Sequence, residues 1–266
     1  MSFSIDGKTA IVTGAANGIG LAIARHFASQ GANVMFADMD DIRLVEELGD
    51  VAEDSNIRYF SGDLREKLTV ANLLSGTIDA FDSVDILVNA SRQVLKTAPL
   101  DADDDSVSTL LQQNLMTSLR LSQLVARRMI KQAKGREDGS IGSIINLSSI
   151  AARRTRPELL AYSISTAALD QMTRSLAVAL APERIRVNAV AFGSVMSASL
   201  KEVLRENQDY REAIEDITPL GRIAAPTELA EAVQYLASDG SAFMTGQILT
   251  VDGGRSLLDP VGAPAH

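Results

Sequence analysis

Short apolar runs alternate with longer segments of helical period along the whole chain. This alternation predicts repeated strand–helix–strand units on a parallel sheet. The expected strands are Thr9–Thr13, Asn33–Asp38, Ile57–Ser61, Ile86–Asn89, Ser143–Leu147, Arg186–Ala191 and Ile248–Val251. The expected helices are Gly18–Ser29, Asp41–Glu47, Leu68–Ala80, Ser106–Lys131, Leu160–Leu180 and Thr227–Ala237, with Gly31 closing the first.

No Pro/Ser-rich linker, internal repeat or low-complexity tract divides the 266 residues. We therefore expect one α/β domain over residues 1–255, a doubly wound sheet of about seven parallel strands with helices on both faces. Residues 256–266 are expected to form a C-terminal tail. The acidic run of residues 101–105 precedes a long helix, where negative charge favours the helix N-terminus.

Composition narrows the functional classes. The net charge of -9 argues against a nucleic-acid or anionic-membrane surface, because both need basic patches. Zero cysteines exclude disulfides and thiolate chemistry, and two histidines cannot form a His/Cys metal cluster, so no metal is expected. The chain shows no signal-peptide pattern and no apolar run long enough for a membrane span. We expect a soluble cytoplasmic protein.

The first strand is followed by a glycine-rich turn that opens a helix. It reads Thr13-Gly14-Ala15-Ala16-Asn17-Gly18-Ile19-Gly20. Glycines let the backbone turn tightly and approach a pyrophosphate, which then lies on the positive end of the helix. A structural turn is the alternative, but the strand–turn–helix context favours a dinucleotide site.

An acidic residue ends the second strand. Asp38 could accept hydrogen bonds from the ribose hydroxyls of adenosine, and its charge would repel a 2′-phosphate. NAD(H) is therefore expected rather than NADP(H). The alternative is a solvated acid at a strand end.

A serine and a tyrosine in the second half of the chain have the spacing of a known catalytic pair. Ser149 follows the apolar run Ile144–Leu147 and precedes Tyr162 by thirteen residues, whereas its neighbour Ser148 does not have that interval. With the glycine turn and the stretch from Thr245 to Gly254, this pattern resembles the short-chain dehydrogenase/reductase family over residues 6–255. The resemblance implies a Rossmann-like fold and hydride transfer between a nicotinamide and an alcohol or ketone.

The resemblance also implies roles for individual residues. Tyr162 would be the general acid or base, Ser149 would hold the reacting oxygen, and Asn114 would anchor a water relay, with Thr166 completing the catalytic positions. Tyr162 would also contact the cofactor. The other implied cofactor contacts are Gly14, Asn17, Gly18, Ile19, Gly20, Asp38, Asp63, Leu64, Asn89, Gly193, Val195 and Ser197.

Two further family features concern the lid and the assembly. Residues at about 194–222 would form a lid over the substrate, with Leu200, Val203 and Leu204 presenting an apolar face. The helices at 106–131 and 160–180 usually build subunit contacts in this family. A homotetramer or homodimer is therefore expected.

One departure from the family affects the chemistry directly. The family has a lysine four residues after the tyrosine, and this chain has Thr166 there. A tyrosine hydroxyl titrates at about 10 when unperturbed, so it is a poor proton acceptor near neutrality without a nearby cation. Loss of that cation is expected to be worth about 3–4 kcal/mol, or on the order of a hundredfold to a thousandfold in rate.

Other departures lie at strand ends. Ser91-Arg92 follows Asn89-Ala90 where the family usually has a glycine, and Phe192 replaces the usual proline before Gly193. Arg92 could reach in as a replacement cation, or it could be an exposed loop arginine. The basic residues at 153, 154 and 156 could attract an anionic substrate, or they could form a solvated loop.

Two hypotheses follow from these patterns. The first is an NAD-dependent oxidoreductase that acts on an alcohol/ketone pair. The second is an NAD(H)-binding protein with little catalysis that acts as a regulator, scaffold or partner subunit. The substitution at position 166 supports the second, and the remaining motif residues support the first.

Overall fold

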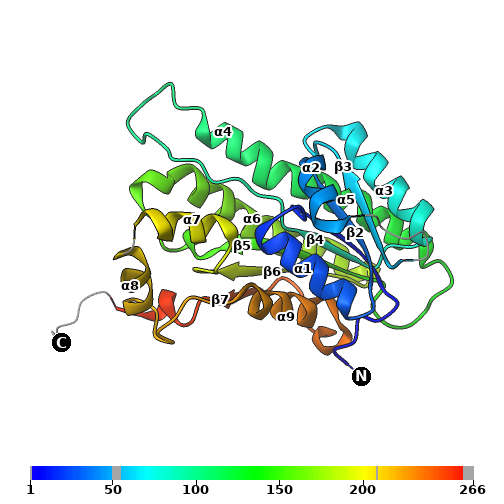
Figure 1. Cartoon of the computed structure of the whole chain (residues 1–266). Helices are drawn as coiled ribbons and strands as arrows, with labels where there is room; N and C mark the ends of the chain where they lie inside the picture. Colours follow the sequence, from blue (N-terminus) through cyan, green and yellow to red (C-terminus); the bar gives the residue numbers. More distant parts are fainter. Residues whose placement is uncertain (1, 50–54, 208, 260–266) are drawn as a thin grey trace.

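The described part of the chain forms a sheet of seven parallel strands (Figure 1). The structure is a computed structural model that describes residues 2–49, 55–207 and 209–259. The strand order is β3-β2-β1-β4-β5-β6-β7. The strands are β1 (Thr9–Thr13), β2 (Asn33–Asp38), β3 (Ile57–Ser61), β4 (Ile86–Asn89), β5 (Gly142–Ser149), β6 (Ile185–Phe192) and β7 (Ile248–Val251).

Helices connect these strands. They are α1 (Gly18–Ser29), α2 (Asp41–Leu48), α3 (Lys67–Phe81), α4 (Ser106–Leu110), α5 (Thr117–Gln132), α6 (Leu160–Leu180), α7 (Ala198–Glu206), α8 (Asp209–Asp216) and α9 (Pro226–Ala237). A π-helical segment, η1 (Leu111–Met116), joins α4 to α5. Short 3-10 segments are η2 (Ile150–Ala152), η3 (Pro157–Leu159), η4 (Ala181–Glu183), η5 (Asp239–Ser241) and η6 (Arg255–Leu257).

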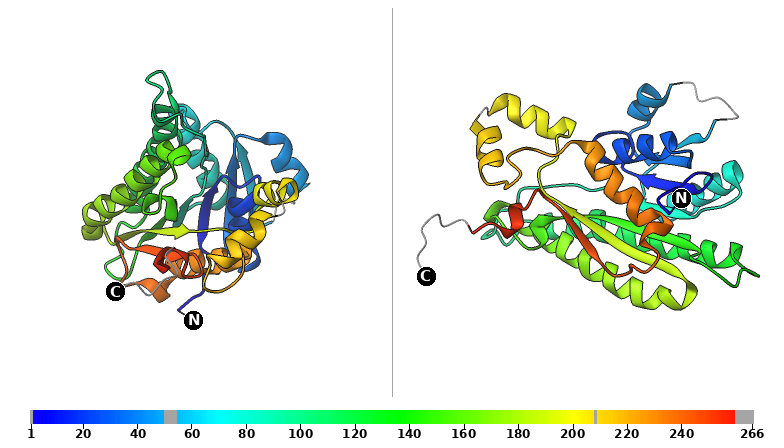
Figure 2. Two further views of the ribbon diagram at one scale, coloured as in Figure 1. Left: turned by 90° about the vertical axis from the view of Figure 1, so that its left-hand side faces the viewer. Right: turned by 90° about the horizontal axis from the view of Figure 1, so that it is seen from below.

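Two apolar cores lie on opposite faces of the sheet. Successive strand residues point to opposite faces, so Val12 packs in the core beneath α1 and α9, and Ile11 packs in the core beneath α3 and α5. Phe36 and Met35 divide in the same way on β2. Figure 2 shows α1 and α9 on one side of the sheet and α6 on the other. The predicted doubly wound α/β fold is confirmed.

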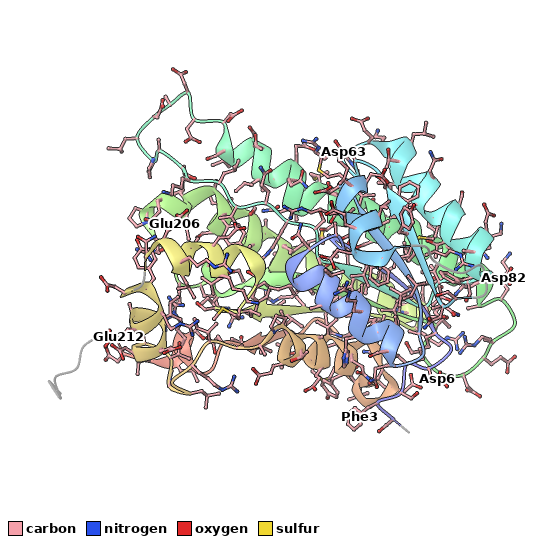
Figure 3. All side chains as sticks on the ribbon, in the orientation of Figure 1. Phe3, Asp6, Asp63, Asp82, Glu206 and Glu212 are labelled. Carbon is pink, nitrogen blue, oxygen red and sulfur yellow. The ribbon has the colours of Figure 1, made fainter. Side chains whose placement is uncertain are left out.

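The strands in the middle of the sheet are buried on both faces, which explains their continuous apolar sequence. β5 and β6 are each longer than predicted, and their pairing continues to Ser149 opposite Phe192. Figure 3 labels Glu206 and Glu212 on α7 and α8 at one end of the molecule, and Asp6 and Asp82 at the other. Because β4, β5 and β6 run parallel, the residues at their carboxyl ends lie along one edge of the sheet.

The prediction of one uninterrupted helix over Ser106–Lys131 is wrong. The helix is α-helical only up to Leu110, widens to π geometry, and becomes α-helical again at Thr117. The Thr117 hydroxyl donates to the carbonyl of Gln112, five residues earlier, at 3.1 Å, which stabilises the wider turn. No proline or glycine marks this site, so helical period alone could not reveal it.

The segment between β6 and α9 contains α7 and α8, which project from the body of the domain (Figure 2). On α7, Leu204 is buried but Val203 is exposed, so the expected apolar face is only partly covered.

The chain after β7 is still structured at the start of the expected tail. The Ser256 backbone N–H donates to the Asp252 carboxylate at 2.8 Å, and η6 continues to Leu257. Residues 260–266 of the expected tail lie outside the described residues. Among the helices of the described residues, none combines the length and apolar character needed to cross a membrane.

Candidate active site

A groove of about 580 Å³ lies at the carboxyl edge of the sheet. The turn after β1, the start of α1, the end of β2, the loop after β4 and the residue before α7 line it, because these segments meet at the carboxyl ends of the parallel strands. Seven of the predicted cofactor residues line this groove, namely Gly14, Asn17, Gly18, Ile19, Gly20, Asp38 and Ser197.

The glycine turn has the shape that a phosphate site requires. Gly14 has φ +67°, and a Cβ there would lie 2.9 Å from the Ala90 carbonyl oxygen and from the Ser91 backbone. Gly18 has φ +56°, and a Cβ there would meet open space. The turn therefore packs tightly against the loop after β4 while α1 begins beside the groove, which fits a dinucleotide pyrophosphate.

Asp38 is held at the groove by backbone donors. Its carboxylate accepts from the Ala16 N–H at 3.0 Å and from the Asp40 N–H at 3.1 Å. The side chain is half-buried and retains a surface toward the groove. The predicted carboxylate is therefore fixed in place rather than freely solvated.

Asp63 forms an ion pair beside the same groove. Its carboxylate accepts hydrogen bonds from Arg65 at 2.6 and 2.9 Å, and this pairing holds the pKa of the Asp63 carboxyl below its ordinary value. Arg65 itself lines the groove. The resemblance to the family did not indicate this arginine.

Two predicted cofactor residues have their side chains inside the protein. Leu64 is buried in the core beneath α3 and α5. Asn89 donates its amide to Ser122 Oγ at 3.0 Å and to Asn146 Oδ1 at 2.8 Å. Neither residue lines the groove.

The segment after β6 is fixed by neighbouring strands. The Gly193 N–H donates to Val251 O at 3.2 Å, and Val195 is buried and forms a bridge with Ala224. Ser197 Oγ accepts from the Leu200 N–H at 3.2 Å and caps α7. These contacts place the start of the proposed lid beside the groove.

Tyr162 is almost fully buried, with 5% of its surface exposed. Its hydroxyl accepts a hydrogen bond from the guanidinium Nη1 of Arg92 at 2.7 Å. The same guanidinium lies over the Phe192 ring, with Cζ 4.2 Å from the ring centroid. Arg92 is therefore a half-buried residue of this site and not an exposed loop arginine.

Thr166 does not replace the family lysine. Its hydroxyl donates to the Tyr162 carbonyl at 2.9 Å and lies 3.2 Å from the Ser163 carbonyl, both within α6. The side chain is buried and uncharged. The described hydrogen bonds of this hydroxyl therefore lie within its own helix.

Ser148 and Ser149 have different surroundings at the end of β5. Ser149 Oγ accepts from the Ala151 N–H at 3.1 Å, and 8% of the residue is exposed. Ser148 is fully buried, and its hydroxyl lies close to Asp170 of α6 without making a hydrogen bond. Of the two, Ser149 keeps some access to the outside.

Asn114 fastens the loop that carries Arg92. Its Oδ1 accepts from the Gln93 N–H at 2.8 Å, and its Nδ2 donates to Gln93 O at 2.9 Å and to Ser165 Oγ at 3.2 Å. The π-helical turn η1 contains this residue. The predicted asparagine thus links the loop after β4 with α6, the helix of Tyr162.

The three arginines after β5 make structural contacts. Arg153 donates to Thr250 Oγ1 at 3.3 Å, Arg154 donates to the Ser256 carbonyl at 3.1 Å, and Arg156 pairs with Glu158 at 2.9 Å. These contacts connect the loop with β7 and η6. An anionic substrate would have to compete with them.

Known proteins share this architecture and much of the sequence. Residues 14–256 match the model of a family described as enoyl-(acyl carrier protein) reductase. An uncharacterised oxidoreductase of Mycobacterium tuberculosis is 35% identical over 260 residues, covering 96% of this chain and 94% of the relative. The chain belongs to the short-chain dehydrogenase/reductase family. The family comparisons give no support to the non-catalytic alternative.

Two solved structures that are similar to this chain contain different cofactors. A 7α-hydroxysteroid dehydrogenase in complex with NADH and 7-oxo glycochenodeoxycholic acid is 30% identical, with a TM-score of 0.85 and coverage of 95% of this chain and 96% of its own. A gluconate 5-dehydrogenase from Burkholderia cenocepacia in complex with NADP and tartrate is also 30% identical, with a TM-score of 0.84 and coverage of 97% and 98%. Family membership therefore leaves NAD and NADP as alternatives.

Proposed function

We propose that this short-chain dehydrogenase/reductase is an NAD(H)-dependent oxidoreductase acting on an alcohol/ketone pair. The observation that carries the proposal is the buried Tyr162 hydroxyl, which accepts a hydrogen bond from Arg92, a residue that lines the groove at the glycine turn. A tyrosine placed in this way can exchange a proton with a substrate oxygen. A binding protein would have no need of that arrangement.

Each residue of the site has a separate role in the proposed alcohol oxidation. The ionised oxygen of Tyr162 takes the proton of the substrate hydroxyl, and in the reverse direction the phenol returns it to the ketone oxygen. Ser149 would donate a hydrogen bond to the same substrate oxygen and hold it in line. A nicotinamide bound in the groove would accept or supply the hydride. The lid residues 194–222 would cover the substrate and exclude water.

The preference for NAD(H) rests on Asp38. Its fixed carboxylate lines the groove where the adenosine ribose would lie, and a 2′-phosphate there would place like charges together. Arg65 is the cation that could offset this repulsion, but Asp63 engages it through both carboxylate oxygens. Replacing Asp38 by alanine should weaken NADH binding and reduce the ratio of the NADPH dissociation constant to the NADH dissociation constant. Cofactor fluorescence titration measures both constants.

Turnover with a panel of alcohols and ketones tests the proposed activity. Tyr162→Phe removes only the reacting hydroxyl and should lower kcat/KM by at least a hundredfold, because general acid–base catalysis typically contributes about 10²–10⁴-fold. Tyr59→Phe is the matched control, since Tyr59 is exposed on β3. If both variants turn over substrate like the wild type, Tyr162 is not the acid–base group.

We also propose a homodimer or homotetramer built on α6. Ile164 and Val178 of this helix expose 41% and 78% of their surface. Light scattering after size-exclusion chromatography would give the mass of the assembly. Val178→Glu should shift that mass toward the monomer if α6 is the contact.

A further inference from the structure

Two departures from the family pattern meet at the Tyr162 hydroxyl, and a third lies four residues after Tyr162 on α6. Thr166 removes the positive charge expected on α6, Arg92 follows β4, and Phe192 ends β6. The guanidinium of Arg92 lies between the Tyr162 hydroxyl, at 2.7 Å, and the Phe192 ring, at 4.2 Å. A cation lost from one element is thus matched by a cation supplied from another.

The backbone on both sides of Arg92 is fixed. Thr13 Oγ1 accepts from the Ala90 and Ser91 N–H groups, both at 3.0 Å. On the other side, the Asn114 amide bonds to both polar backbone groups of Gln93. Arg92 therefore projects from a held loop, and its position at the tyrosine is determined by the fold.

Phe192 supports the charged group from one face. A guanidinium is planar and weakly hydrated, so it stacks on an aromatic ring at little desolvation cost. Phe192 is 3% exposed and paired in register with Ser149 of β5. The proline that the family usually has here would offer no such surface.

We propose that Arg92 is the catalytic cation of this enzyme, replacing the family lysine, and that Phe192 is its positioning residue. This inference rests on the proposed role of Tyr162 as acid–base group. The guanidinium donates to the tyrosine oxygen at 2.7 Å, and its positive charge favours the negative oxygen that accepts the substrate proton. The exchanged proton moves only between Tyr162 and the substrate.

The first test measures turnover near neutral pH. Arg92→Met keeps the aliphatic length but removes the charge, and should lower kcat about tenfold to a hundredfold, with a smaller loss at alkaline pH. Arg92→Lys should retain part of the activity because the charge remains without the planar stacking. Arg136→Ala is the matched control, since Arg136 is an exposed arginine near the amino ends of the strands.

A charge swap distinguishes a catalytic cation from a structural one. Introducing Thr166→Lys into the Arg92→Met variant places the charge on α6. The double variant should have a kcat at least tenfold higher than that of Arg92→Met alone. Phe192→Leu should lower kcat less than Arg92→Met and should have no further effect in the Arg92→Met background. Circular-dichroism melts of each variant establish that it is folded.

The second test needs neither cofactor nor turnover. The chain has four tyrosines, so the ultraviolet phenolate signal of Tyr162 is obtained by subtracting the matched Tyr162→Phe spectrum. In the cofactor-free protein, this signal should appear at higher pH in the Arg92→Met background than in the wild-type background. If no substrate in the panel is turned over, that result counts against the proposed function alone. The phenolate measurement still tests the effect of Arg92 on Tyr162.

Two results would overturn the inference. One is an unchanged phenolate signal in the Arg92→Met background. The other is faster turnover together with tighter NADH binding by Arg92→Met, which would show that the guanidinium obstructs the nicotinamide position instead of assisting the tyrosine.

Discussion

Replacing Asp170 by asparagine is expected to stabilise the protein at neutral pH. Asp170 lies on α6, is 4% exposed, and its Oδ1 has no hydrogen-bond partner. Burial raises the pKa of its carboxyl above the ordinary value of 3.8, while Ser148, Arg153 and Arg174 oppose that rise. The ionised carboxylate is therefore a cost to the folded state.

The magnitude follows from the missing partner. A buried acceptor without a hydrogen bond costs about 1–3 kcal/mol. An asparagine amide at position 170 carries no charge and can donate to the Ser148 hydroxyl, which also lacks a partner. A gain of about 1 kcal/mol corresponds to about 2–4 °C in Tm for a large single domain, so Asp170→Asn should raise the Tm by several degrees at pH 7.

The gain should depend on pH in one direction. Because the folded-state pKa is raised, the wild-type carboxyl contributes most favourably below 3.8, where it is protonated in both states, and that contribution is lost as pH rises through the folded value. The Tm advantage of Asp170→Asn should therefore shrink as pH falls toward 3.8. Thermal melts by circular dichroism at a series of pH values measure it, with Asp79→Asn on the exposed face of α3 as control. A Tm below that of the wild type at pH 7, or an advantage independent of pH, would refute the reasoning.

Three other substitutions test the site and its support. Gly14→Ala should abolish measurable NADH binding, because its Cβ would press on the Ala90 carbonyl at 2.9 Å in a left-handed conformation; isothermal titration checks this. Asn114→Ala should cost about 1–3 kcal/mol in urea unfolding and lower kcat, since it leaves the Gln93 backbone unpaired. Arg186→Ala should cost about 1–3 kcal/mol in the same assay, because this buried guanidinium is a donor to three acceptors around the end of α9; an unchanged free energy of unfolding would contradict it.

The sheet could be predicted because its signal is local. Each strand of the sheet is a short apolar run between turn residues, and the helices α1 and α6 begin and end where their patterns do. The π-helical turn at Asn114 could not be predicted in this way. Asn114 of this turn accepts from the N–H of Gln93, twenty-one residues away, and no helical period encodes that contact.

In the candidate site too, local features could be predicted from the sequence and long-range contacts could not. The turn at Gly14 and the carboxylate of Asp38 line the groove as expected, because they are tied to strand ends. The contact of Arg92 with Tyr162 and Phe192 joins residues that are seventy and one hundred positions apart in the chain. The sequence showed each departure separately, but their common location depends on the parallel arrangement of β4, β5 and β6.

The Thr13 hydroxyl has a consequence for how this enzyme can change. It ties the start of the glycine turn to the loop after β4, and Gly14 packs on the same loop. A cofactor seated on the turn would press on the backbone that carries Arg92. Under the proposed roles, cofactor affinity and proton exchange would share one stretch of main chain, so a mutation selected for either property would alter both.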